Sequence, residues 1–267
     1  MIGQYRVYDA HAHVFPGKIA ARAVDSISDF YHLGMRYDGI PHNLDAMYER
    51  AGIDGVLIFT TATVAHQVHT INNFIAAKCA KYSRFVGMGC LHPKMDGIAQ
   101  EIERVCELGL SGIKLHPDFQ HFNIDDENLL PMYREIAAHG LPVMLHVGDD
   151  RYDASSPERL ARVLDKVPDL VAIGAHFGGW RQWECARHCL KGSSAYFDTS
   201  SSLAFMSPAY FRELCYELGT DRLMFGTDYP MWDVQDEFKR FMTLGLSEED
   251  NRKILGENFE KLFGLRK

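Results

Sequence analysis

Short apolar runs alternate along the chain with longer segments in which apolar residues recur every three or four positions. Eight of the short runs, each bounded by turn residues, predict β-strands. They cover residues 5–10, 55–59, 85–90, 112–115, 142–147, 171–175, 195–198 and 222–225. Because segments of helical spacing separate the strands, the pattern predicts a parallel sheet whose strands are connected by helices.

Helices are predicted where apolar residues form a stripe along one face. The clearest cover residues 98–107, 129–138, 157–166 and 208–218. Ser247, which precedes three acidic residues, is the expected N-cap of a closing helix. Residues 16–32 follow the first strand and predict a further helical segment, which we expect to serve as part of a lid or as a dimer contact.

The number of strands favours a closed barrel. Eight parallel strands with intervening helices form an α/β fold of the (β/α)8 TIM-barrel type, which typically has about 250 residues; this chain has 267. An open, doubly wound sheet is the alternative, but no glycine-rich phosphate loop follows a predicted strand. No linker or repeat divides the sequence, so we expect a single domain over residues 1–267.

Composition and charge exclude several classes of partner. The net charge of -8 is spread along the chain without a basic stripe, so neither nucleic acid nor an anionic membrane is an expected partner. No apolar run approaches the roughly 18–20 residues that cross a bilayer, and residues 1–4 contain no apolar leader core. We therefore expect a cytoplasmic protein that acts on a small molecule, with homo-oligomer formation left open.

The six cysteines are scattered and form no CxxC pair. Cys185 and Cys189 are four residues apart on an expected helix and could share a zinc ion. Buried free thiols are the commoner state in a reducing compartment, so we expect free thiols.

The first candidate for chemistry is the stretch YDAHAHVF at residues 8–15. Alternate residues of a strand point to the same face, so a strand here would direct Asp9, His11 and His13 to one side. Buried polar groups need partners, and a divalent metal is a partner that three such side chains could share.

Further polar residues lie at the carboxyl ends of later predicted strands, where barrel enzymes place their functional groups. These residues are Lys114, His116, His146, His176 and Asp228. Asp198 ends another strand, although the polar run after it is also typical of a loop. Each residue alone has a structural alternative, such as a turn aspartate or a hydrogen-bonded core histidine. Their joint recurrence at one rim favours a metal site.

Together these motifs resemble the amidohydrolase superfamily, and within it the amidohydrolase-2 family of aminocarboxymuconate-semialdehyde decarboxylase-like metal-dependent hydrolases. The resemblance covers nearly the whole chain and is carried by YDAHAHVF, GIKLHPDFQHF, LPVMLHVG, AHFGG, FGTDYP and KILGENFEKLFGL. It implies a TIM-barrel enzyme with a divalent metal, usually zinc, held by His11, His13, His146 and Asp228. His176 is implied to lie close to the reacting group.

Lys114 leaves the number of metal ions open. In binuclear members of the superfamily a carboxylated lysine on the fourth strand bridges two metals, and Lys114 occupies the corresponding place. In the decarboxylase branch that lysine is typically absent and one metal suffices. We expect a single metal, with Lys114 as an additional ligand in the binuclear alternative. Histidine and carboxylate ligands suit zinc, and manganese or iron are alternatives.

The expected reaction is hydrolysis of a C–N or C–O bond in an amide or lactone. Asp228 would deprotonate the attacking water, and His176 would hydrogen-bond the water or the oxyanion. The alternative is decarboxylation of a small aromatic or muconic acid, with Asp228 as the proton source; a remote alternative is a non-catalytic metal-binding barrel. Arg151, Arg181 and His116 are the candidate substrate-binding residues.

Overall fold

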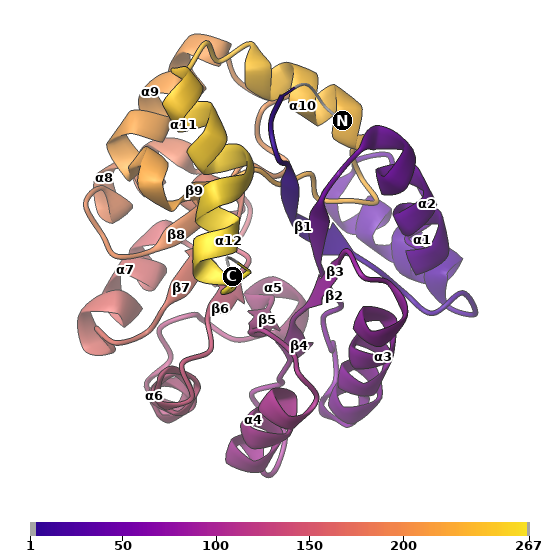
Figure 1. Cartoon of the computed structure of the whole chain (residues 1–267). Coiled ribbons are helices and arrows are strands. Elements are labelled where there is room, and N and C mark those ends of the chain that lie inside the picture. Colours follow the sequence, from indigo (N-terminus) through magenta and orange to yellow (C-terminus); the bar gives the residue numbers. More distant parts are fainter. Residues whose placement is uncertain (1–3, 266–267) are drawn as a thin grey trace.

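Parallel strands form a ring in a computed structural model of the chain, which describes residues 4–265 (Figure 1). The strands are β1 (Tyr8–His13), β2 (Gly55–Phe59), β3 (Phe85–Gly87), β4 (Gly89–Cys90), β5 (Ile113–Leu115), β6 (Val143–Leu145), β7 (Ala172–Gly174), β8 (Tyr196–Asp198) and β9 (Leu223–Met224). Each pairs in parallel with its neighbour, in one ladder from β1 to β3 and another from β4 to β9.

Backbone hydrogen bonds connect the two ladders into a barrel. β3 and β4 flank Met88, whose N–H donates to the Ile58 carbonyl at 3.0 Å, so together they occupy one strand position. At the other junction, the N–H of Ala10 donates to the Phe225 carbonyl at 2.8 Å, and the N–H of Asp228 donates to the His11 carbonyl at 2.9 Å. The predicted (β/α)8 architecture is confirmed, with eight strand positions around the ring.

The helices surround this ring in Figure 1. They are α1 (Ala20–Tyr31), α2 (Pro41–Ala51), α3 (Val68–Lys81), α4 (Ile98–Glu107), α5 (Pro117–Gln120), α6 (Leu130–Ala138), α7 (Pro157–Lys166), α8 (Trp183–Leu190), α9 (Pro208–Leu218), α10 (Val234–Met242), α11 (Glu248–Arg252) and α12 (Asn258–Leu262). Short 3-10 helices are η1 (Ala65–Gln67), η2 (Glu127–Leu129), η3 (His176–Gly178) and η4 (Thr220–Arg222), and a π-helical turn is η5 (Lys253–Glu257).

Three of the predicted helices, α4, α7 and α9, have the bounds expected from their apolar stripes. The side chain of Ser247 caps α11 by accepting from the N–H of Asp250, as expected. A helix around Cys185 and Cys189 was expected and is present as α8. Helices α2, α3 and α10 were not predicted. In α2, for example, only Leu44 and Tyr48 are large buried side chains that follow the helical repeat, and this stripe is too narrow to distinguish.

The strands are mostly shorter than predicted, and the first lies later in the chain. It covers residues 8–13 rather than 5–10 because its pairing with β2 begins where Tyr8 lies opposite Gly55. The ring of Tyr8 occupies the space that a Cβ at Gly55 would need, so a glycine is required at this end of the ladder.

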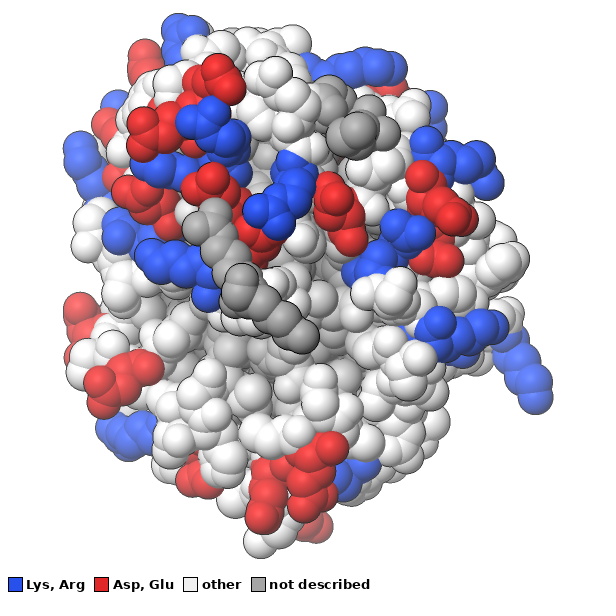
Figure 2. Space-filling view, viewed as in Figure 1, with Lys and Arg blue, Asp and Glu red and all other residues white. Residues whose placement is uncertain are grey.

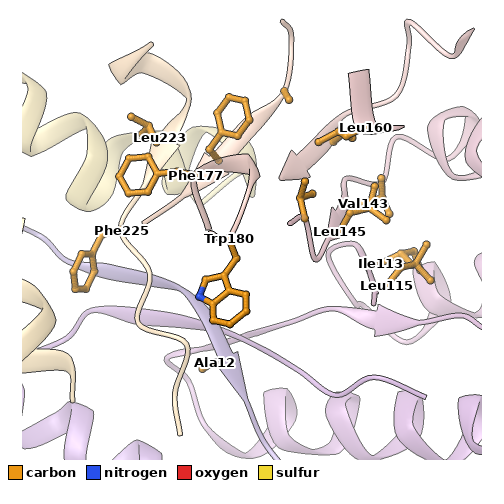
Figure 3. Close-up of a cluster of buried hydrophobic side chains, with 14 of the residues drawn as sticks. Ala12, Ile113, Leu115, Val143, Leu145, Leu160, Phe177, Trp180, Leu223 and Phe225 are labelled. Carbon is orange, nitrogen blue, oxygen red and sulfur yellow. The ribbon is translucent and has the colours of Figure 1, made fainter. Parts of the chain in front are cut away.

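Two apolar clusters leave one end of the barrel free for polar residues. The larger lies between strands and helices; Figure 3 shows Ile113, Leu115, Val143 and Leu145 of β5 and β6 together with Leu160 of α7. The smaller fills the amino-terminal end of the barrel and includes Ala10, Leu57, Phe59, Met88, Met144, Ile173, Met224 and Phe259. Phe259 comes from α12, which lies across the ring in Figure 1.

The distribution of charged side chains on the face shown in Figure 2 agrees with the expectation that the protein has no basic stripe. In Figure 2, basic and acidic side chains are interspersed over the visible face. Among the described residues, no helix combines the length and the apolar composition that crossing a bilayer requires. Residues 1–3, which were part of the expectation about a leader, lie outside the described residues.

Candidate metal centre

Three side chains from the two ends of the chain meet at the carboxyl end of the barrel. The Nε2 atoms of His11 and His13 are 3.3 Å apart. Asp228 Oδ1 lies 3.4 Å from His11 Nε2 and 3.3 Å from His13 Nε2. We call these three atoms the donor triangle; their convergence is the one expected from the HAH and FGTDYP motifs.

An irregularity in β1 determines which side chains face the barrel interior. The pairing of β1 with β2 shifts register between Asp9 and Ala12. Ala10 belongs to the interior apolar cluster, and the rings of His11 and His13 lie edge-on to Phe59 of the same cluster. Asp9 instead contacts α2, so the prediction that it shares a face with the two histidines is wrong. Alternation along a strand fails at such a bulge.

Asp9 connects β1 to the segment that follows β9. Its carboxylate accepts hydrogen bonds from the backbone N–H of His11 and of Thr227, both at 2.9 Å, and from Tyr48 Oη at 2.5 Å. Burial raises the pKa of Asp9 to about 6, and the bonds from Thr227 and Tyr48 offset only part of that rise. Asp9 therefore holds the backbone beneath the donor triangle and makes no hydrogen bond to either imidazole ring of the triangle among the described residues.

Asp198 orients His11 instead. Its Oδ2 accepts from His11 Nδ1 at 2.9 Å, and its Oδ1 accepts from the backbone N–H groups of His176 and Ser200 at 3.1 and 3.0 Å. Burial alone would raise the pKa of Asp198, but the neighbouring imidazoles and hydrogen bonds lower it overall. An ionised carboxylate at Nδ1 leaves the lone pair of His11 on Nε2, directed into the donor triangle.

The protonation states of the donor triangle suit a cation. Burial lowers the pKa of His11 to about 3, so its imidazole is neutral near pH 7. The pKa of Asp228 lies well below its usual value, because the attraction of His11 and a hydrogen bond from His13 outweigh the effect of burial. Ser201 Oγ donates to Asp228 Oδ2 at 2.5 Å, which leaves Oδ1 for the triangle.

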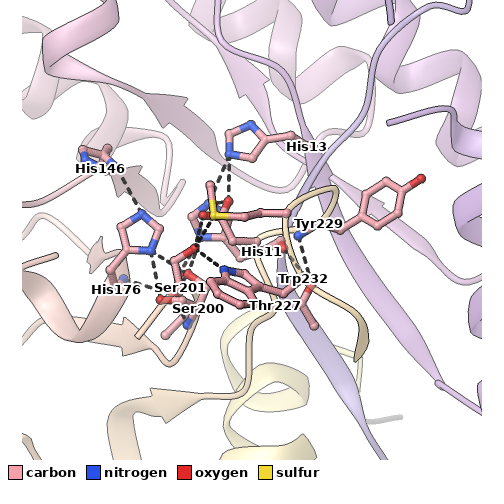
Figure 4. Close-up of polar contacts among 12 residues, drawn as sticks. His11, His13, His146, His176, Ser200, Ser201, Thr227, Tyr229 and Trp232 are labelled. Carbon is pink, nitrogen blue, oxygen red and sulfur yellow. Dashed lines mark hydrogen bonds and ion pairs between the residues drawn. The ribbon is translucent and has the colours of Figure 1, made fainter. Parts of the chain in front are cut away.

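His176 and His146 extend the polar site to one side (Figure 4). His176 Nδ1 is 2.8 Å from Ser200 Oγ, and its Nε2 is 3.0 Å from His146 Nδ1. His146 Nε2 donates to the Gly148 carbonyl at 2.9 Å. Within residues 4–265, potential ligand atoms at this end of the barrel lie within 4.8 Å of one another in two groups of three residues. One group is the donor triangle, and the other is His11, His176 and Asp198; neither includes His146. A metal-binding role for His146 stays a prediction.

Lys114 and His116 lie on the same side of the barrel as His146. Lys114 Nζ is fully buried, has no hydrogen-bond partner in the described part of the chain, and is 4.7 Å from the centre of the Phe59 ring. Burial lowers the pKa of Lys114 to about 8, although Asp198 and Asp228 favour its charged form. His116 Nε2 is 2.8 Å from Tyr31 Oη, and its ring stacks on that of His146.

The two candidate arginines lie outside the donor triangle. Arg151 donates to both oxygens of Asp149, at 2.9 and 2.7 Å, and to the Phe30 carbonyl. Its guanidinium is thus engaged in an internal ion pair. Arg181 stacks on Trp180 and Phe205, with its guanidinium carbon 4.8 and 5.3 Å from the ring centres. Substrate binding by either arginine, or by His116, stays a prediction.

Three site residues escaped the sequence analysis. Tyr31 reaches His116 and His146 from the end of α1, a helix that was expected to form part of a lid or a dimer contact. Ser200 and Ser201 bond the histidines and Asp228 from the loop after β8. The sequence feature that indicated the two serines was the polar run from residue 199 to 202, directly after a predicted strand.

The spacing of the donor triangle fits a tetrahedral metal. Ligand bonds of about 2.0–2.1 Å place neighbouring ligand atoms of such an ion about 3.3–3.4 Å apart. The three observed separations, 3.3 to 3.4 Å, match that value. The side chains of His13 and Asp228 are 13% and 12% exposed, so this side of the triangle is open to further ligands. A mixed nitrogen and oxygen set can accept zinc, manganese or iron.

Comparison with known proteins gives a consistent set of relatives. A family model described as amidohydrolase matches residues 8–265. The chain is 25% identical to a gamma-resorcylate decarboxylase of Polaromonas sp. strain JS666, over 85% of each chain. It is also 25% identical to a 2-amino-3-carboxymuconate-6-semialdehyde decarboxylase of Dictyostelium discoideum, over 68% of this chain and 62% of that relative.

A solved structure has the same fold along almost the whole chain. It is a dihydroxybenzoic acid decarboxylase from Polaromonas sp. JS666 with bound manganese and the inhibitor 2-nitroresorcinol. The TM-score is 0.78 at 18% identity, over 99% of this chain and 98% of that one.

Proposed function

The chain belongs to the amidohydrolase family, and on this premise we propose that it is a metal-dependent decarboxylase of small aromatic acids. The donor triangle carries the proposal, because it supplies two imidazoles and one carboxylate at the rim where barrel enzymes react. The sequence predicted a hydrolase first and a decarboxylase as the alternative. The relatives at 25% identity are decarboxylases, so they support the alternative.

The metal would be held by His11, His13 and Asp228, with His146 as a fourth candidate ligand. We propose zinc from the donor spacing, with manganese as the competing ion because the dihydroxybenzoic acid decarboxylase binds it. When bound, the ion would polarise an oxygen atom of the acid substrate. Asp198 would keep the His11 ring in the orientation that this binding needs.

Aromatic side chains near the donor triangle suit a planar substrate. Trp180, Phe205 and Trp232 form a series of edge-to-face contacts with ring centres 6.3 and 6.0 Å apart. Trp232 is tied to the site because its Nε1 donates to Ser201 Oγ at 2.9 Å. Such a surface provides apolar contact for an aromatic ring while the carboxylate and hydroxyl groups face the polar residues.

Asp228 is the proposed proton carrier. Its carboxylate would take the proton of a substrate hydroxyl group and deliver it to the ring carbon that bears the carboxylate. The bond to the carboxylate then breaks, carbon dioxide leaves, and the electron pair of that bond restores the aromatic ring as a phenolate. Ser201 would hold the other carboxylate oxygen during the transfer.

Hydrolysis is the second candidate, and Lys114 is the observation that favours it. The Lys114 amine is buried beside two carboxylates and has no hydrogen-bond partner within residues 4–265. This environment is compatible with the binuclear alternative, which belongs to hydrolytic members of the superfamily. This candidate uses the same donor triangle but requires a second metal ion and a different substrate.

The test is an assay of the zinc- or manganese-loaded protein with 2,6-dihydroxybenzoate and other hydroxybenzoic acids. We expect carbon dioxide release and, in deuterium oxide, deuterium at the vacated ring carbon. Asp228→Asn should abolish both signals, whereas Asp165→Asn, a change at an exposed aspartate, should preserve them. Turnover of a lactone or amide without carbon dioxide release from any acid would establish the hydrolase instead.

A further inference from the structure

A second group of metal-binding side chains lies on the outside of the barrel, where α7 packs beside α8 (Figure 1). Cys185 and Cys189 are on α8, and Glu158 is in the first turn of α7. One donor atom from each of these three residues lies within 4.8 Å of the others. We propose that this group, the thiol site, binds a thiophilic divalent cation such as zinc.

The separation of the two sulfur atoms supports this assignment. Side chains four residues apart lie on the same face of a helix, and here the Sγ atoms are 3.6 Å apart. Zinc–sulfur bonds of about 2.3 Å at a tetrahedral ion place two sulfur ligands about 3.8 Å apart. Binding would therefore need only a small outward movement of two side chains whose helical backbone is already fixed.

The glutamate gives the site a ligand from a second helix. The Cys185 thiol is hydrogen-bonded to the Glu158 carboxylate, so the carboxylate already faces the sulfur atoms. Two thiolates and a carboxylate leave one tetrahedral position for water. A cation held by all three would link α7 to α8.

The site is accessible, and the neighbouring cationic side chains are engaged elsewhere. Glu158 is exposed and both cysteines are partly exposed, which gives an ion a direct path. Arg187 of α8 and Lys191, which directly follows that helix, form ion pairs with Glu217 of α9. The site is chemically distinct from the donor triangle, which contains no sulfur.

Cadmium titration of the chelator-treated full chain, kept reduced with a phosphine, tests the thiol site. Thiolate-to-cadmium charge transfer absorbs in the ultraviolet, and the ligands of the donor triangle cannot produce this band. We expect the band to saturate at a single thiolate-bound cadmium per chain. It should be lost in Cys185→Ser/Cys189→Ser and retained in Cys106→Ser, which removes an exposed thiol of α4.

The carboxylate is tested separately. Glu158→Gln should weaken cadmium binding by about tenfold or more, whereas Glu184→Gln, in the first turn of α8, should not. Circular dichroism would verify that the variants are folded. Absence of the band in the wild type, its persistence in the double cysteine variant, or equal affinities of the two glutamate variants would overturn the proposal.

Discussion

At the scale of single residues, two buried aspartates show how surroundings decide the role of a side chain. Asp9 is bonded by neutral donors, and its pKa rises to about 6. Asp198 is bonded by the imidazole of His11, and its pKa falls. Asp9 therefore holds two backbone segments together, whereas Asp198 is a fixed negative charge that orients His11, a candidate metal ligand.

Asp198→Asn should weaken metal binding by about 10- to 100-fold, because the amide no longer fixes the orientation of His11. Calorimetric titration of the chelator-treated protein with zinc would measure the change. Asp169→Asn, at an exposed aspartate, is the control. Unchanged affinity in a folded Asp198→Asn protein would exclude this positioning role.

Glu237 on α10 should make the protein less stable as the pH rises. It is 1% exposed, and burial raises its pKa to about 7 despite an ion pair with Arg240. Between its ordinary value of 4.5 and 7, the folded state retains a proton that the unfolded chain has released, so the free energy of unfolding falls across this range.

Denaturant unfolding at several pH values would measure this contribution. In Glu237→Gln the fall should be smaller than in the wild type. Asp169→Asn, which removes an exposed carboxylate outside α10, should leave the fall unchanged. Parallel profiles of the wild type and Glu237→Gln would contradict the prediction.

At the scale of elements, the loops after β6 and β7 approach each other at the backbone. A Cβ at Gly148 would lie 2.2 Å from the Trp180 nitrogen and 2.4 Å from the Gly179 carbonyl carbon, and Gly148 has a φ of +87°. The Trp180 N–H also donates to the Val147 carbonyl at 2.8 Å. Only glycine permits this close approach of the two loops. The approach fixes the position of the Gly148 carbonyl, which accepts a hydrogen bond from His146 Nε2.

Gly148→Ala should therefore destabilise the fold by several kcal/mol, because backbone atoms cannot move aside as a flexible side chain can. Gly140→Ala is the matched control: its φ is +65°, but a Cβ there meets no atom within 4 Å. Its cost should be about 1–2 kcal/mol, from the backbone conformation alone. Denaturant unfolding would compare them, and equal losses would refute the steric explanation.

Periodicity predicted much of the fold but could not locate its irregularities. Apolar runs identified the strand positions, and His11, His13 and Asp228 were expected at the rim because they lie at the edges of those runs. The bulge after Asp9 was not predictable, because alternation assumes a regular ladder. The contact between Asp198 and His11 joins distant segments, so its recognition required the packed barrel.

At the scale of the whole molecule, the donor triangle draws its atoms from both ends of the chain. His11 and His13 belong to β1, whereas Asp228 follows β9. The barrel is joined at this place by only a few backbone hydrogen bonds. A cation held across the junction would bind the folded state only, and so would stabilise the entire barrel.

Zinc at about 100 times its dissociation constant should raise the free energy of unfolding by about 2.7 kcal/mol. Thermal unfolding of the chelator-treated protein with and without zinc would show this as a higher Tm. The zinc-dependent increase should be much smaller in His13→Ala, although a contribution from the thiol site would persist. An increase as large in His13→Ala as in the wild type would argue against binding at the donor triangle.

The junction between β1 and β9 also has a consequence for synthesis on the ribosome. β1 is the first strand of the barrel to emerge, but its partner across the junction, β9, is translated only after all the other strands. Until then the nascent polypeptide exposes an unpaired strand edge that carries His11 and His13, and unpaired strand edges are targets for chaperones. Capture of the ion would then report that translation of the barrel is complete.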